Sequence, residues 1–309
     1  MTGTLKSLGS RAIIGAFFKR LEEVTTASWV AALASMYTAN QETETYTFVS
    51  DSPSLKERGA RQTKRAGLKA FELSLRNKVY QNILEIDDDD FRRDKTDQIL
   101  ARVRDRAVRA AQLPQKVMTE LLNANGNAYD GVAFFHASSH KNLNGDTIAN
   151  LVSRDITTPA APTVQECIDA VLAAIGQITA FKDDEGEPRN EFAKSFMVMV
   201  PPNMSTAMLA AVRNDYPASG TSNTLKNSDY SIEVRSNARL TGTTVFDVFR
   251  TDSDVKSLLW QDEVPTTFAE RNPENSDKGF EDEVHMFKVK RVCAGGYGRF
   301  DQACRVSFT

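Results

Sequence analysis

Two histidines four positions apart, His136 and His140, are the residues whose spacing most directly suggests chemistry. On a helix, this spacing lets two imidazoles bind one metal ion. The glutamate that follows the first histidine in helical zinc hydrolases is replaced by Ala137. The flanks are typical of strand and loop, so we interpret both as surface or strand-end histidines. A metal-dependent hydrolase using this pair and an aspartate is kept as an alternative, which stoichiometric bound zinc would support.

Other residue types capable of catalysis stand in patterns that favour structural roles. Asp87 to Asp90 lack the spacing of a calcium loop, so we predict that they complement the dipole at a helix start. The run Gly295-Gly296-Tyr297-Gly298 lacks the lysine of a phosphate-binding loop and predicts a tight turn between strands. Cys167, Cys293 and Cys304 form no CxxC pair and are expected to be buried, reduced thiols. No histidine stands beside a nucleophile elbow, so the sequence predicts neither an enzyme nor a cofactor.

A basic run is the most strongly charged segment. It has one acidic residue, Glu57, and six basic residues: Lys56, Arg58, Arg61, Lys64, Arg65 and Lys69. No aromatic residue interrupts it, so phosphate contact would be its only mode of nucleic-acid binding. We prefer docking onto an acidic protein surface, for which the candidate partners are Asp87, Asp88, Asp89, Asp90, Asp183, Asp184 and Glu185. A nucleic-acid-binding protein that uses this run is the alternative, and a steep loss of binding with salt would identify it.

Composition places the chain among globular proteins. Its 309 residues carry 38 basic and 41 acidic side chains, a formal net charge of −3, and 41% of them are hydrophobic. This balance gives no global attraction to nucleic acid. No apolar run approaches the roughly 20 residues of a membrane span, and the N-terminus lacks the apolar segment of a secretory signal. These features predict a cytoplasmic product without a membrane partner.

Hydrophobic periodicity predicts an N-terminal arm followed by a hairpin that has no core of its own. Apolar side chains recur at helical intervals in residues 5–24, and a second apolar stretch occupies 29–37. Strands are predicted at 45–49, 71–75 and 79–86, so the basic run is the excursion of an extended hairpin. We expect both arm and hairpin to pack on another surface.

A helix of about thirty residues, at about 92–124, is predicted to be a structural spine. Pro114 should kink or restart it, because proline lacks a backbone donor and clashes with the preceding turn. An apolar strand is predicted at 132–136, and the polar residues 137–162 form the best candidate boundary.

The remainder of the chain mixes helices and strands, which makes the fold class α+β. Thr163 and Glu166 form a capping box for a helix with an apolar face that extends to Ile178. The other predicted elements are a helix at 204–213 and strands at 196–200, 230–235, 243–250, 255–260, 284–292 and 303–308.

This order of elements resembles that of tailed-phage major capsid proteins of the Hong Kong 97 type. More specifically, the chain resembles the major head subunit of Mu-like phages and prophages, the gpT family. The residues that carry the resemblance are Thr45-Tyr46 through Pro53-Ser54-Leu55-Lys56-Glu57, Ile86 to Phe91, Leu113-Pro114, Tyr129-Asp130-Gly131, Phe134-Phe135 and His140. It covers most of residues 15–140, with weaker support from Lys288 to Arg299, and residues 160–265 match only as a pattern of elements.

The resemblance implies a Hong Kong 97-like fold with four parts. Residues 1–40 would be an N-terminal arm, and 41–86 an extended E-loop lying across a neighbouring subunit. A peripheral P-domain would combine 87–155 and 266–309 around the spine helix, and 156–265 would form the inserted, axial A-domain.

The function that the resemblance implies is mechanical. Many copies would form hexamers and pentamers of an icosahedral shell, enclosing the double-stranded DNA genome of a tailed phage or Mu-like prophage. The implied site of assembly is the host bacterial cytoplasm, and the implied final location is the virion. Because only about 40 residues precede the E-loop, we expect a separate scaffolding protein or protease. A portal, a decoration protein and packaged DNA, bound without sequence specificity, complete the expected partners.

Overall fold

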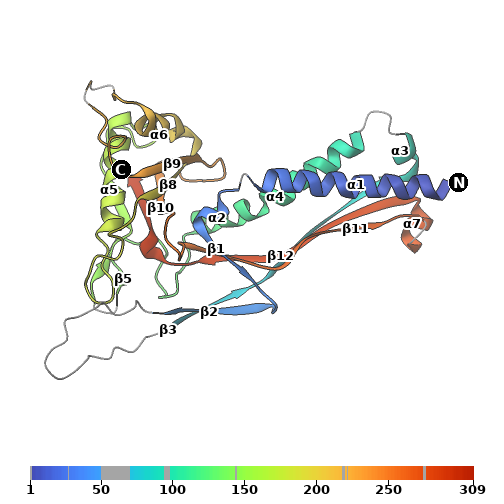
Figure 1. Ribbon diagram of the computed structural model, residues 1–309, viewed down its shortest axis with the longest axis horizontal. Helices are drawn as coiled ribbons and strands as arrows, with labels where there is room; N and C mark the ends of the chain where they lie inside the picture. Colours follow the sequence, from blue (N-terminus) through green and yellow to red (C-terminus); the bar gives the residue numbers. More distant parts are fainter. Residues whose placement is uncertain are drawn as a thin grey trace.

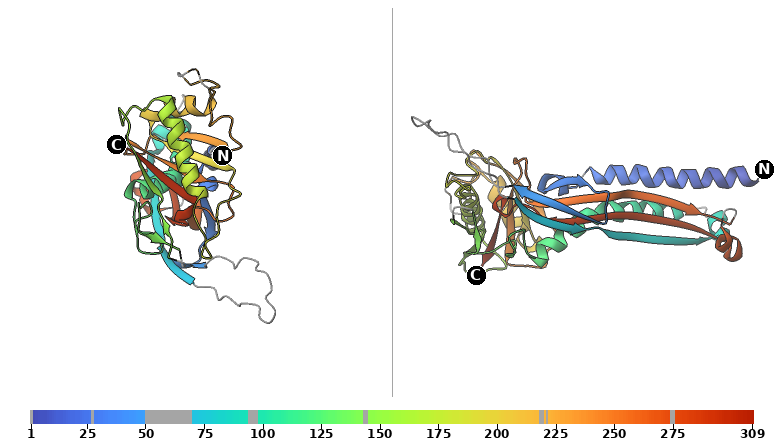
Figure 2. Two further views of the ribbon diagram at one scale, coloured as in Figure 1. Left: turned by 90° about the vertical axis from the view of Figure 1, so that its left-hand side faces the viewer. Right: turned by 90° about the horizontal axis from the view of Figure 1, so that it is seen from below.

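Two β-sheets lie at different positions along an elongated molecule (Figure 1). The computed structural model describes residues 2–26, 28–49, 70–93, 98–142, 145–217, 220, 222–273 and 276–309. A four-stranded sheet has the order β1-β11-β12-β4, and a five-stranded sheet has the order β7-β13-β10-β8-β9. The four-stranded sheet and its helices form a long limb, and the five-stranded sheet lies at one end of it (Figure 2).

The elements have the following bounds. The helices are α1 (Thr2–Thr25), α2 (Val30–Leu33), α3 (Asp88–Arg93), α4 (Gln98–Ala124), α5 (Val164–Thr179), α6 (Pro202–Arg213), α7 (Asp277–Asp282) and a 3-10 turn, η1 (Phe300–Gln302). The strands are β1 (Ala34–Thr38), β2 (Thr43–Val49), β3 (Ala70–Arg76), β4 (Lys78–Asp87), β5 (His140–Lys141), β6 (Thr147–Ile148), β7 (Leu151–Arg154), β8 (Ser195–Val200), β9 (Ser231–Ser236), β10 (Val245–Arg250), β11 (Leu258–Arg271), β12 (Val284–Tyr297) and β13 (Ala303–Phe308). In the described part of the chain, no helix is both long and apolar enough to span a membrane.

The five-stranded sheet holds the main core. Its central strand β8 is buried along almost its whole length, because α5 and α6 cover one face and the C-terminal part of α4 covers the other. The predicted capping box starts α5: Thr163 accepts a backbone N–H from Glu166, whose carboxylate accepts the N–H of Thr163. The sequence therefore located this helix start correctly.

Several predicted elements differ from the structure. The helix runs through Pro114 without interruption, because the buried proline ring packs in the helix–sheet contact, and that packing outweighs the lost backbone bond. Residues 132–136 form a loop whose Phe134 and Phe135 are buried, not a strand. Asp88 begins the separate short helix α3, which confirms a helix start at the aspartates, but α4 begins only at Gln98.

Gly295 allows α4 to lie directly on β12. The predicted turn at residues 295–298 is wrong, because β12 continues to Tyr297. A Cβ atom at position 295 would lie 3.1 Å from side-chain atoms of Val117, Met118 and Leu121. The absence of a side chain is therefore what brings helix and strand together.

An ion pair fastens the end of α4 to the five-stranded sheet. Arg305 of β13 binds Asp247 of β10 at 2.6 and 2.9 Å, and it donates a further bond of 2.9 Å to the carbonyl oxygen of Leu122. Burial lowers the pKa of Arg305, but the Asp247 carboxylate outweighs that effect and holds the pKa above its ordinary value. The carbonyl at the negative end of the helix thus gains a charged donor.

A second buried network joins η1 to the loop after α5. Asp301 is 1% exposed and accepts hydrogen bonds from Arg189 and Arg299. Burial alone would raise the pKa of Asp301, but the two guanidiniums, Arg299 first, hold it below the ordinary value. Asn190 ties the same loop down by donating to the carbonyl oxygens of Ile178 and Asp301.

We expect Gly295→Val to destabilise the fold by about 1–3 kcal/mol, because the new side chain overpacks the seat of α4. The control is Gly176→Ala in α5, where an added Cβ meets nothing within 4 Å. That change should stabilise the protein by about 0.5–1 kcal/mol through helix propensity. Denaturant unfolding of both variants measures the two effects, and equal stability of Gly295→Val and the wild type would contradict the packing argument.

We expect Asp301→Asn to cost about 3–5 kcal/mol at neutral pH, because it leaves two guanidiniums buried without their counter-charge. The folded-state pKa of Asp301 is depressed, so its stabilisation is present above the unfolded-state pKa of about 3.9 and is lost as the pH falls below it. The stability gap between variant and wild type should therefore narrow in acid. Unfolding curves from pH 7 to 3 measure this gap, with exposed Asp254→Asn as control; a gap constant with pH would oppose the assignment.

Candidate functional site

The histidines serve the fold. His140 is fully buried, which corrects its interpretation as a surface or strand-end residue. Its Nδ1 lies 2.6 Å from Asp130 Oδ2, its Nε2 lies 3.2 Å from the carbonyl oxygen of Phe134, and its ring stacks on Phe300 at 3.9 Å. His136 Nδ1 accepts two backbone N–H groups of the turn that follows it. Within the residues described, no three His, Cys, Asp or Glu side chains gather as metal ligands.

The three cysteines are buried, free thiols, as predicted. Burial is the main cause that raises the pKa of Cys167, Cys293 and Cys304 to about 12. Thiols with such pKa values carry almost no thiolate at neutral pH and are poor nucleophiles.

The basic run 56–69 lies outside the described residues, so its six side chains have no structural account. Its flanking strands β2 and β3 form the expected antiparallel ribbon, which begins with Thr43 opposite Arg76 and continues to Val49 opposite Ala70. The ribbon is a separate two-stranded sheet, and it ends beside β12, where Leu75 covers Gly296.

The candidate acidic partners are largely engaged within their own subunit. Asp88 lies 2.8 Å from His285 Nε2, and Asp87 accepts the backbone N–H of Asp89. Asp183 accepts two backbone N–H groups in its own turn, where Asp184 and Glu185 are half-buried. Asp90 and Asp87 are the exposed members of the set.

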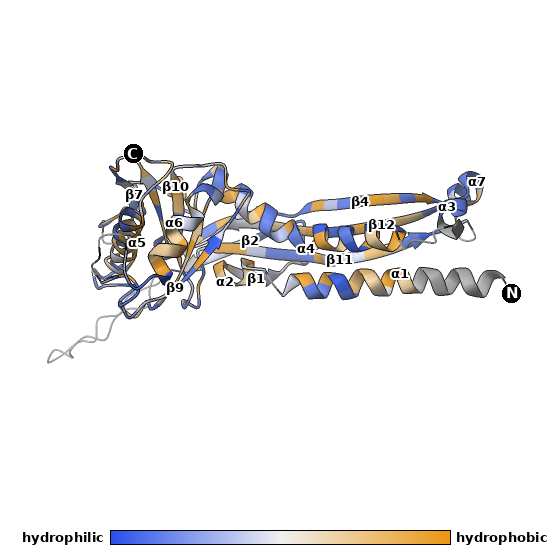
Figure 3. Cartoon of the chain, turned by 90° about the horizontal axis from the view of Figure 1, so that it is seen from above, coloured by the Kyte–Doolittle hydropathy of each residue, from blue (hydrophilic) through white to orange (hydrophobic). Residues whose placement is uncertain are grey.

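One face of the four-stranded sheet is covered by helices and the other is open. Leu84 of β4 and its partner Phe287 of β12 face α1 and α4, in a small core completed by Ile13, Phe17 and Val103. Figure 3 shows both helices running beside the long strands, with β4 at the sheet edge.

Alternate residues of a strand point to opposite faces, so the side chains next to this core lie on the other side of the sheet. There, Val79 is 58% and Ile83 52% exposed. We call this surface the open face; its members are Val79, Gln81, Ile83, Glu85, Val264, Thr267, Ala269, Val284, Met286, Lys288, Lys290 and Val292.

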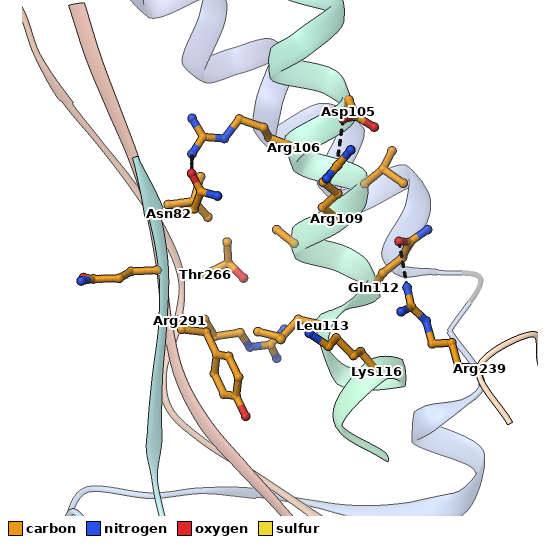
Figure 4. A pocket seen from close by; sticks show the side chains of 15 residues that line it. Asn82, Asp105, Arg106, Arg109, Gln112, Leu113, Lys116, Arg239, Thr266 and Arg291 are labelled. Carbon is orange, nitrogen blue, oxygen red and sulfur yellow. Dashed lines mark hydrogen bonds and ion pairs between the residues drawn. The ribbon is translucent and has the colours of Figure 1, made fainter. Parts of the chain in front are cut away.

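A groove with basic walls lies on the opposite, helical side. It has a volume of about 610 Å³ between α4, β4 and β12, and Arg239 closes one end (Figure 4). We call it the basic groove; its cations are Arg106, Arg109, Lys116, Arg239 and Arg291, and the apolar side chains Tyr80, Val108, Leu113 and Val289 also line it. Asp105 is the acidic residue of its lining.

Hydrogen bonds hold the groove's arginines in place. Arg106 donates to Asn82 at 2.8 Å and to the carbonyl oxygen of Phe287 at 3.2 Å, and its burial lowers its pKa. Arg109 pairs with Asp105 at 2.9 Å, whereas Arg239 bonds a neutral partner, Gln112. The groove therefore keeps a net positive charge after internal pairing.

Sequence reasoning missed both surfaces. The arginines of α4 formed a visible signal, but their groove requires residues from 80 to 291 that only the fold brings together. The open face had a weaker signal, the alternation in β4, which cannot show that the second face lacks a cover.

Known proteins provide an independent view of the chain. A family model described as "Mu-like prophage major head subunit gpT" matches residues 10–164, half of its length. A comparison with curated proteins gave no match.

Several solved capsids share the fold. The capsid of cyanophage P-SCSP1u has a TM-score of 0.57 at 11% identity, and the match covers 89% of this chain and 86% of that one. For the procapsid of bacteriophage JBD30 the TM-score is 0.52 at 16% identity, with coverage of 99% and 76%. For the virus-like particle of Pyrococcus furiosus it is 0.55 at 10% identity, with coverage of 95% and 96%.

These likenesses show a mixed α+β fold of the Hong Kong 97 capsid type. Together with the family match, they give no support to the alternative of a nucleic-acid-binding protein that uses the basic run. The chain belongs to the family of Mu-like prophage major head subunits, gpT, a structural and non-catalytic class of phage capsid protein.

Proposed function

We propose that copies of this subunit assemble through hexamers and pentamers into the icosahedral shell that encloses a double-stranded DNA genome. The observation that carries this proposal is the open face. A sheet that buries one face only and presents Val79 and Ile83 to solvent is typical of a surface that another molecule covers. In a shell of identical subunits, that molecule is a neighbouring copy.

We further propose a division of labour along the chain. The arm is 1–40, the E-loop 41–86, the P-domain 87–155 with 266–309, and the A-domain 156–265. Sheet pairing favours three adjustments: β4 joins the P-domain sheet, β11 enters it from Leu258, and β13 joins the A-domain sheet.

The ribbon of β2 and β3 is the proposed cover for a neighbour's open face. It has no core of its own, and its apolar side chains alternate with polar ones along β3. The basic run beyond it would meet exposed carboxylates such as Asp87 and Asp90 of that neighbour. Each such surface pair contributes under about 1 kcal/mol, so specificity comes from many contacts.

Assembly in the host cytoplasm, and action in the virion, follow from this proposal. A separate scaffolding protein or protease, a portal and a decoration protein are the further proposed partners. Packaged DNA would be held without sequence specificity.

We expect the wild-type protein, expressed with its neighbouring reading frames, to form closed shells, tubes or rings visible by electron microscopy. Ile83→Glu should prevent them, because it places a carboxylate in the apolar contact. Its free energy of unfolding should change by less than about 0.5 kcal/mol, since position 83 is exposed in the subunit.

Ile83→Val, which keeps the surface apolar, is the matched control and should assemble. A wild-type protein that stays monomeric or dimeric with its neighbours present would refute the shell, and normal shells from Ile83→Glu would exclude the open face as a contact.

We expect the combined reversal of Arg58, Arg61 and Arg65 to Glu to block shell formation without unfolding the subunit. The reason is repulsion between the reversed run and the carboxylates that it contacts. Electron microscopy measures assembly and circular dichroism measures folding. Replacing the same three arginines with lysine keeps the charge and should preserve assembly; normal shells from the glutamate variant would disprove the pairing.

A further inference from the structure

A small knob at the far end of the limb presents an aromatic ring among carboxylates. The helix α7 lies in the connection from β11 to β12, and its Phe280 is 76% exposed. Four acidic side chains around it, Asp277, Glu281, Asp282 and Glu283, are exposed as well. We call these five residues the α7 knob.

The knob is held rigidly by residues that surround it. Ser276 Oγ accepts the backbone N–H of Gly279, and a Cβ at position 279 would lie 2.5 Å from the carbonyl oxygen of Asn272. Lys278 binds Glu85 of β4 at 2.8 Å, which fastens the knob to the sheet. A knob fixed in this way loses little conformational entropy when it binds.

The basic groove is complementary to the α7 knob in charge and in polarity. Its cationic walls face a space floored by apolar side chains, Tyr80 and Leu113 among them (Figure 4). Carboxylates would meet Arg109, Lys116 and Arg239, while an aromatic ring would reach the floor. A nucleic-acid backbone would satisfy the walls but has nothing apolar to bury, so the floor favours a protein segment that carries a ring.

The knob of the same copy does not line the groove. It lies beyond α3 at the end of the limb, whereas the groove lies along the middle of α4 (Figure 3). The complementary surfaces of one chain therefore meet only between copies.

We propose that the α7 knob of one subunit docks into the basic groove of a second subunit, with Phe280 on the apolar floor and its carboxylates on the arginine and lysine walls. This inference rests on the proposed shell, in which limbs of neighbouring subunits meet. The contact joins two different surfaces, so it can link subunits into closed rings. It uses the helical side of the limb and leaves the open face available.

Cysteine cross-linking tests the contact in the full chain. Glu281→Cys in the knob is combined with Lys116→Cys at the groove wall, and the three native thiols stay unreactive because burial raises their pKa values to about 12. Mild oxidation should give covalent dimers and larger species. The control pairs Lys116→Cys with Phe192→Cys, an equally accessible position at 80% exposure, and should give none.

Cross-linking is measured both in assembled particles and in concentrated, unassembled subunits. Its absence from both, or equal yield from the control pair, overturns the knob-in-groove contact. If no particles form, the shell proposal fails by itself, and the result from the subunits still decides this inference.

Charge exchange in the same cysteine background identifies the occupant. Asp282→Lys or Arg109→Glu alone should lower the cross-linking yield by about two- to fivefold, and the two together should restore it. Phe280→Ser should lower the yield by about tenfold or more, since it removes the ring that anchors the contact. Failure of the combination to recover would mean that the groove binds another anion, such as DNA phosphate or a different acidic protein, and would refute the proposal.

Discussion

The contact between α4 and β12 is the constraint on which the other parts of the molecule depend. At Gly295 the strand offers no Cβ, so Val117, Met118 and Leu121 rest against its backbone. From this seat the helix reaches the five-stranded sheet, where Arg305 binds the carbonyl oxygen of Leu122. One helix is thereby fixed to both sheets. The direction of the limb, and with it the positions of the open face and the basic groove, follows from these two attachments.

A limb built in this way is stable as a subunit but incomplete as a surface. The helices α1 and α4 bury one side of the sheet in a small core around Phe17 and Phe287, and nothing in the described chain buries the opposite side of β4. An antiparallel sheet tolerates one solvated face when that face is polar. Here Val79 and Ile83 interrupt the polar pattern. Their apolar area is too small to drive aggregation of single subunits, but it is repeated in every copy of a shell.

Local signals predicted the elements well and their partners poorly. The capping box at Thr163 and Glu166 located a helix start because it depends on residues three apart. Pro114 misled, since its ring is stabilised by tertiary packing that no local pattern records. The glycines at 295 and 296 suggested a turn by composition, yet their role is close approach of a helix and of Leu75, which come from distant parts of the sequence. His140 looked accessible for the same reason: its partners Asp130 and Phe300 are brought together only by the fold.

Assembly of identical copies depends on how charge is distributed, more than on its sum. A net charge of −3 lets subunits approach without strong repulsion. Within that near-neutral total, the groove gathers five cations while the α7 knob gathers four carboxylates. Separated charges of opposite sign on one chain favour contacts between unlike surfaces, and such contacts set an orientation for each neighbour. Because every exposed pair is weak, a misplaced subunit can leave before further contacts retain it. A near-neutral subunit with segregated charges is therefore suited to a lattice that forms reversibly and is stabilised by the number of its contacts.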